Sequence, residues 1–65
     1  MIRTIIRSPN NVVMVFDENG EQIPEYQGQY EEVKERILKD APPDAVFARG
    51  FTDVGELRRV SREEW

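Results

Sequence analysis

The strongest constraint on the fold is one stretch of helical periodicity that ends at a pair of prolines. Its apolar side chains recur at i, i+3, i+7, i+8 and i+11, which places them along one stripe of an α-helix. Pro42 and Pro43 stop the helix, because proline removes a backbone donor and restricts the residue before it. We therefore expect one long helix in a chain of 65 residues. Its apolar positions are Tyr30, Val33, Ile37, Leu38 and Ala41.

Three segments before this helix have the patterns of β-strands. Residues 2–7 are rich in β-branched side chains and alternate with a period of two, which is typical of a half-buried strand. Residues 12–16 are apolar throughout, as in a strand covered on both faces. Asn19 and Gly20 then predict a type I′ turn, in which both residues need positive φ. A short third strand at about residues 21–26 completes a β-meander, and a proline within it restricts it to a sheet edge.

The residues after the helix predict a further strand and leave one choice open. Residues 45–48 form the fourth strand. The remaining residues fit either a second helix or a strand at residues 56–60 followed by a helical turn. In the second arrangement Ser61 and Glu64 form a capping box. We favour the strand, because Gly55 would weaken the first turn of the alternative helix.

Together these elements predict a single α+β domain that spans residues 1–65. Its sheet is small and mostly antiparallel, with four or five strands arranged as a β-meander, the helix, and then a strand or hairpin. The amphipathic helix covers one face of that sheet. Because a proline blocks the third strand, we expect the free edge at the first strand or the C-terminal strand.

The second face of this sheet needs a cover of its own. Along the second strand Val12, Met14 and Phe16 point one way, while Val13 and Val15 point the other way. One helix covers only one face, and we expect Val13 and Val15 on the face that it leaves open. An apolar face of this kind marks an interaction site unless another segment covers it.

The C-terminal tail offers two solutions to this problem. Either Trp65 folds back and becomes a core residue, or it serves as an anchor in a partner. Tryptophan and arginine are the residue types most enriched among interface hot spots. We predict a non-enzymatic interaction module, an adaptor, regulatory or self-associating subunit, that binds a protein partner or a second copy in a homodimer. The predicted interaction residues are Val13, Val15, Arg58, Arg59, Arg62 and Trp65.

Two other function classes remain as alternatives. RNA or single-stranded DNA could bind a sheet face on which aromatic rings alternate with arginines. The residues for this alternative are Phe47, Arg49, Phe51, Arg58 and Arg59. The net charge of −4 argues against a nucleic-acid partner, because the molecule as a whole repels polyanions. The third class is a small enzyme that uses carboxylates alone, but a chain of this size has little room for an enclosed site.

Composition excludes most chemistry of nucleophiles and metals. The chain has no His and no Cys, so there is no imidazole or thiolate for catalysis, for zinc or for a disulfide. The glycines match no nucleotide-binding motif, and we expect no cofactor and no metal. No apolar run reaches the length of a membrane span, so we expect no membrane partner. Without cysteine, a cytoplasmic location is the expectation.

Overall fold

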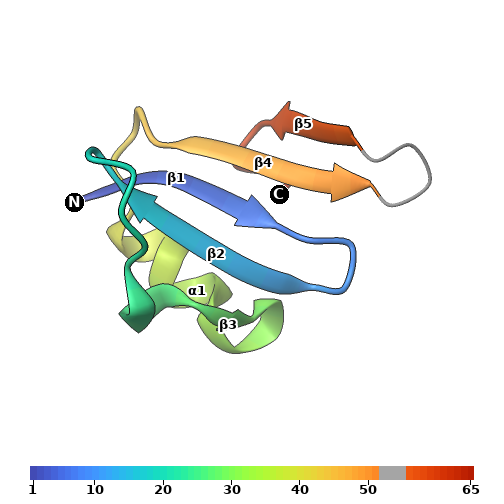
Figure 1. Ribbon diagram of the computed structural model, residues 1–65, viewed down its shortest axis with the longest axis horizontal. Helices are drawn as coiled ribbons and strands as arrows, with labels where there is room; N and C mark the ends of the chain where they lie inside the picture. The colour runs from blue at the N-terminus through green and yellow to red at the C-terminus, as the bar shows by residue number, and fades with distance from the viewer. Residues whose placement is uncertain (52–55) are drawn as a thin grey trace.

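The computed structural model describes residues 1–51 and 56–65, and it leaves out the side chains of Phe51 and Glu56. One helix packs on one face of a five-stranded sheet, which confirms the predicted α+β fold (Figure 1). The elements in chain order are β1 (Ile2–Arg7), β2 (Val12–Asp17), the 3-10 helix η1 (Pro24–Tyr26), β3 (Gly28–Gln29), α1 (Tyr30–Asp40), β4 (Val46–Phe51) and β5 (Glu56–Val60).

The strands lie in the order β3-β2-β1-β4-β5, so β1 is in the middle of the sheet. Neighbouring strands are antiparallel except for β1 and β4, which are parallel. The edges of the sheet are β3 and β5. The prediction of a free edge at β5 is confirmed, and the alternative of a free edge at the first strand is wrong, because β4 returns beside β1 after the helix.

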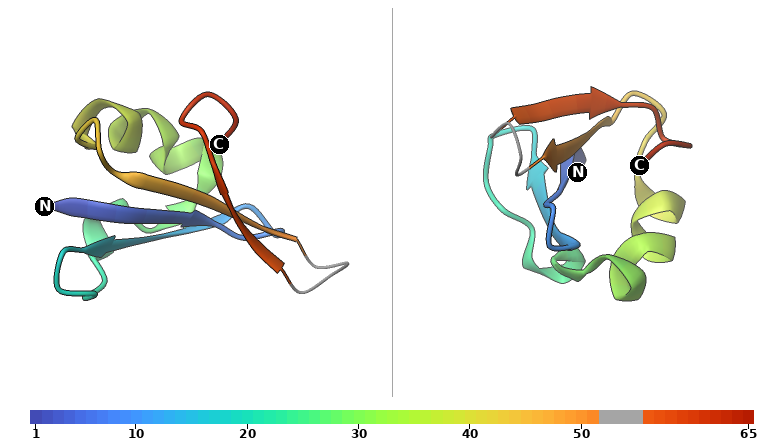
Figure 2. Two further views of the ribbon diagram at one scale, coloured as in Figure 1. Left: turned by 90° about the horizontal axis from the view of Figure 1, so that it is seen from above. Right: turned by 90° about the vertical axis from the view of Figure 1, so that its right-hand side faces the viewer.

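Helix α1 lies where its periodicity predicts it. Val33 and Ile37 are its buried residues, and both face the sheet. Its last turn closes with the N–H of Ala41 donating to the carbonyl of Ile37 at 2.8 Å. Figure 2 shows α1 on one side of the sheet, with the C-terminal tail turned to the same side. None of the described helices has the length and apolar composition to cross a membrane.

The turn after β2 differs from the predicted type I′ turn. Gly20 has a φ of 80°, but Asn19 is not in the left-handed region. The reason is the side chain of Asp17, whose Oδ1 accepts hydrogen bonds from the N–H groups of Asn19 and Glu21, at 2.8 and 2.9 Å. An aspartate that satisfies two turn N–H groups favours an Asx-type turn, which needs positive φ at the glycine alone.

The predicted third strand at residues 21–26 is wrong in position. Within it only Gln22 forms a β-bridge, to Phe16. Pro24 then starts η1, since its fixed φ suits the first residue of a helical turn. The strand that pairs with β2 comes later and has only the two residues of β3.

The prediction that Val13 and Val15 lie on the uncovered face is wrong. Both side chains are 0% exposed and belong to the core beneath α1, together with Val33 and Ile37. A period of two divides a strand into two sets of side chains, but it does not say which set the helix covers. Here the helix covers the two valines, and the larger side chains of β2 take the opposite face.

The C-terminal segment follows the favoured prediction. Strand β5 spans Glu56–Val60 and pairs with β4. Ser61 and Glu64 form the predicted capping box: the Ser61 Oγ accepts from the Glu64 N–H, and the Ser61 N–H donates to the Glu64 carboxylate, both at 3.2 Å. The turn predicted at residues 52–55 lies outside the described residues.

Candidate interaction surface

The face of the sheet opposite α1 carries a continuous set of apolar side chains, which we call the open face. The strand register places Ile6 beside Met14 on one side and Ala48 on the other, and Ala48 beside Arg59. Figure 1 looks onto this face, and Figure 2 shows α1 on the far side of the sheet. The open face consists of Thr4 and seven apolar residues, Ile6, Val12, Met14, Phe16, Val46, Ala48 and Leu57, and Arg59 lies at its border.

Most side chains of the open face are half-buried, and Ala48, at 5% exposed, is buried. Val12 and Leu57, which lie toward the two sides of the sheet, are 38% and 56% exposed. In the part of the chain that the structure describes, no helix or strand covers this face. Strand β2, which is almost entirely apolar, is therefore covered on one face only, although strands of this composition are usually covered on both faces.

The size of the open face limits what it can bind. Strands of six residues are about 20 Å long, and four strands at about 4.8 Å spacing are about 19 Å wide. The face therefore measures roughly 400 Å², which is within the range of the largest apolar patch on a typical monomer. A standard protein interface buries about 800 Å² per partner, so this face supplies about half of one.

Charges of opposite sign lie at different borders of the open face. Arg59 is exposed on β5. The loop after β2 carries exposed Glu18 and Glu21, and Glu18 lies 3.5 Å from the amino group of Met1 at the start of β1. A partner that fits this surface needs an apolar centre and a rim with charges at both ends.

Trp65, one of the predicted interface residues, is in the core. It is 3% exposed and makes edge contacts with the rings of Tyr30 and Phe47, at centroid distances of 5.1 and 5.2 Å. Arg7 donates to its main-chain oxygen at 2.6 Å. Of the two predicted roles the core role is confirmed, and Trp65 covers the helix side of the sheet rather than the open face.

The predicted arginines do not form one surface. Arg62 caps the end of α1, where its guanidinium donates to the carbonyl oxygens of Leu38, Ala41 and Pro42 at 2.9 to 3.2 Å. The carbonyls of Leu38 and Ala41 lie at the helix end, where acceptors lack an intrahelical donor, whereas the Pro42 carbonyl also accepts from the N–H of Ala45 at 3.0 Å. Arg58 lies on the helix side of the sheet, and of the predicted set Arg59 alone borders the open face.

The residues of the nucleic-acid alternative are divided between the two faces. Phe47 is 3% exposed and packs against Trp65, so its ring has no room for a stacked base. Arg49 and Arg58 pair on the same side of the sheet as Phe47, whereas Arg59 is on the other side. The side chain of Phe51 lies outside the described residues. This arrangement does not give the flat aromatic platform that the alternative requires.

A row of three arginines crosses the helix side of the sheet. Arg7 pairs with Arg49 across β1 and β4, and Arg49 pairs with Arg58 across β4 and β5. Arg7 also lies over the Tyr30 ring, with its guanidinium carbon 3.6 Å from the ring centroid. Sequence analysis missed this row, because nothing in the residue pattern indicated that β1 and β4 would be parallel neighbours.

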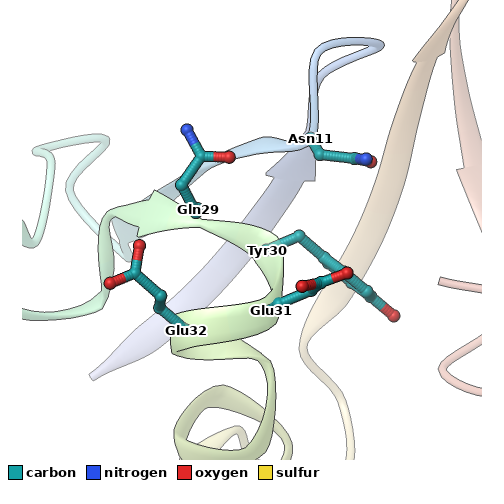
Figure 3. Close-up of a pocket in the computed structure, with 5 residues that line it drawn as sticks. All are labelled: Asn11, Gln29, Tyr30, Glu31 and Glu32. Atoms are coloured by element: carbon teal, nitrogen blue, oxygen red, sulfur yellow. The ribbon is translucent and has the colours of Figure 1, made fainter.

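A shallow pocket of about 320 Å³ lies at the start of α1 (Figure 3). Figure 3 shows the Glu31 and Glu32 side chains pointing away from each other, so they do not form a carboxylate pair. Tyr30 is the one residue of the lining that is not exposed. Ligand sites are usually lined by apolar side chains with a few convergent polar groups, and this pocket lacks that character. Its lining residues are Asn11, Gln29, Tyr30, Glu31 and Glu32.

Among the described residues, two side chains have shifted pKa values, and local hydrogen bonds explain both. The hydroxyl and then the N–H of Ser61 lower the pKa of the Glu64 carboxyl. The hydrogen bond that Tyr26 donates to the Asp40 carboxylate, at 2.7 Å, raises the pKa of the Tyr26 hydroxyl. Neither group lies on the open face, and each shift follows from a hydrogen bond within the fold.

Comparison with known proteins adds no further assignment. No protein-family model, no curated protein and no solved structure matches the chain.

Proposed function

We propose that this chain is a small non-enzymatic interaction module that binds another protein through the open face. The observation that carries the proposal is the row of apolar side chains from Met14 through Ile6 to Ala48, on a face that no described element covers. A protein partner with an apolar patch would complete the second layer of the sheet. We place this module in the cytoplasm, because the chain has no cysteine and thus no disulfide framework.

The strength of such binding follows from the area. If about 400 Å² leaves water on each partner and about 60% of it is apolar, burial contributes roughly 12 kcal/mol at about 25 cal/mol per Å². Association costs about 4–15 kcal/mol in lost motional freedom, which offsets most of that gain. The proposed complex is therefore reversible, and its lifetime depends on the rim contacts of Arg59 and the acidic loop.

A different protein fits this surface better than a second copy. Two open faces packed together would bury about 800 Å² in total, below the roughly 1,200 Å² of stable interfaces. Each copy also has a net charge of −4, so two copies repel each other. A different partner can extend over the rim and bury more surface. We therefore expect a monomer in a light-scattering concentration series.

Site-specific photo-cross-linking in intact cells tests the proposal. A cross-linking side chain at Met14 of the open face should capture a discrete protein, whereas one at Glu35, exposed on α1, should not. The captured protein is then purified and titrated. Met14→Lys should weaken binding at least tenfold, and Asn10→Lys, with the same added charge in the exposed β1–β2 turn, should not. Equal capture at both positions, or equal affinity of both variants, would overturn the proposal.

A further inference from the structure

We infer that the open face accepts an amphipathic helix of the partner protein, which lies over β1 and β4 as a second helical layer on the sheet. This inference rests on the proposed function and names the kind of element that binds. It has three supports: the parallel pairing of the two central strands, the dimensions of the open face, and charges of opposite sign on its two sides.

The two central strands are covered by a helix on one face only. Strands β1 and β4 are parallel neighbours from Thr4 opposite Val46 to Arg7 opposite Arg49. Sheets built from parallel strands are nearly always covered by helices on both faces, because the connections between such strands are usually helical. Helix α1 supplies this layer on one side, and no described helix or strand lies on the other (Figure 2). A helix is therefore the element that fits the uncovered side of the central pair.

The dimensions of the open face favour a helix over a single extended segment. An α-helix is about 10–12 Å across with its side chains and rises about 1.5 Å per residue, so about 14 residues span the roughly 20 Å length of the face. Placed over β1 and β4, it leaves about 4 Å of the roughly 19 Å width on each side. The main-chain N–H and C=O groups of an extended segment would lose water here without gaining partners, whereas a helix satisfies them internally.

Two other occupants fit the open face less well. A partner sheet would need several strands side by side to cover the same width. The loop after β2, residues 18–21, projects on the open-face side of the sheet (Figure 2), so a wide layer would meet it, whereas a helix over β1 and β4 lies beside it. Helix α1 of a second copy is excluded, because its Val33 and Ile37 are buried against its own sheet.

Charges on the two sides of the central strands specify the polar flanks of the partner helix. Arg59 is exposed on β5 and lies opposite Ala48, whereas Glu21 is exposed in the loop after β2, on the other side of the central pair. Among the described residues, neither of these two charged side chains has an ion-pair partner. They match an apolar stripe with acidic residues along the flank toward β5 and basic residues along the flank toward β2. Turning a helix end for end exchanges its flanks, so these charges also fix the direction in which the partner helix lies.

A peptide titration followed by NMR tests the inference. The capped peptide AEKLAEKLEKLAEKL forms, as a helix, one apolar stripe with glutamates along one flank and lysines along the other. The capped peptide LEAKAELKLEAKLEK has the same composition, but its apolar residues alternate as in a strand. Each peptide is added to the isotope-labelled chain at up to about millimolar concentration.

We expect the helical peptide to shift the amide signals of Ile6, Met14 and Ala48, because the anchors of a docked helix lie along one stripe. It should bind at least about tenfold more tightly than the permuted peptide. Nuclear Overhauser contacts between its successive amide protons should show that it is helical when bound.

Two charge variants of the protein test the flanks. Arg59→Glu should weaken binding of the helical peptide about threefold or more, because an attractive pair at the border becomes a repulsive one. Lys39→Glu makes the same change of charge on α1, where that side chain is exposed, and should leave the affinity unchanged, since the peptide has no net charge. The inference is overturned if neither peptide binds, if both bind equally, if the bound peptide is extended, if the shifted signals lie outside the open face, or if both variants have the same effect.

Photo-cross-linking at Met14 tests the proposed function separately from these peptides. Capture of a protein at Met14 without binding of the helical peptide would support the proposed function and overturn the helix as its occupant. Binding of the helical peptide without capture would support the inference that the open face accepts a helix and overturn the proposed function.

Discussion

Removing the Trp65 side chain should cost most of the stability of this domain. A buried tryptophan takes about 250 Å² out of water, which at about 25 cal/mol per Å² corresponds to roughly 6 kcal/mol. Large-to-alanine substitutions in cores cost about 3–5 kcal/mol. A domain of 65 residues is stable by only about 3–10 kcal/mol in total, at about 0.05–0.15 kcal/mol per residue. We expect Trp65→Ala to be largely unfolded or close to its unfolding midpoint without denaturant.

Phenylalanine at the same position should be tolerated. It keeps a ring against Tyr30 and Phe47, and it removes the indole Nε1, a buried donor that finds no acceptor among the described residues. A buried unpaired donor costs about 1–3 kcal/mol, and its removal offsets most of the lost packing. We expect Trp65→Phe to lower the free energy of unfolding by about 1 kcal/mol or less.

Urea unfolding followed by far-ultraviolet circular dichroism measures both variants, since each lacks the single tryptophan of the chain. Leu57→Ala is the control, because that apolar side chain is 56% exposed and its loss should cost under about 0.5 kcal/mol. If Trp65→Ala also costs under about 1 kcal/mol, the tail is not part of the core. If phenylalanine and alanine cost the same, the argument about the unpaired Nε1 is wrong.

Three more predictions use the same unfolding or titration measurements. Arg62→Ala should lower the free energy of unfolding by about 1.5–3 kcal/mol, since hydrogen bonds from a charged group to three carbonyls are lost. Arg62→Lys should recover only part of this stability. Equal stability of the unmodified protein and both variants would contradict the capping role of Arg62. In Ser61→Ala the pKa of Glu64, followed by NMR, should rise toward its ordinary value, and an unchanged pKa would refute the capping box. Because the pKa of Glu64 is lowered in the folded state, its carboxylate stabilises the fold at pH values above the unfolded-state pKa. This stabilisation is lost as the pH falls through the folded-state pKa. Val13→Ala should cost about 2 kcal/mol and Met14→Ala about 1 kcal/mol or less, and the reverse order would mean that the helix covers the other face.

The elements that depend on local sequence were predictable. The stripe of α1, its stop at the two prolines and the capping box after β5 all follow from residues within a few positions of each other. The third strand failed because Pro24 favours a helical turn as well as an edge strand, and the pattern does not distinguish the two.

The assignment of faces could not be predicted from the sequence. The alternation in β2 separates Val13 and Val15 from Met14 and Phe16, but only tertiary packing decides which pair the helix covers. The arginine row depends on the parallel pairing of β1 with β4, and that pairing brings together residues from distant parts of the chain. The sequence could not decide between a core role and an interface role for Trp65 either, because the direction of the C-terminal tail depends on where β5 ends relative to α1.

The central parallel pair also has a consequence for how the chain folds. Ile5 pairs with Phe47, so the two strands meet only after a loop of about forty residues has closed, at an entropic cost of about 3 kcal/mol. The β1–β2 hairpin needs no such closure and should form first. Contacts between distant residues slow folding. Since Trp65 packs on Phe47, its fluorescence should report the slow step, when β4 docks beside β1.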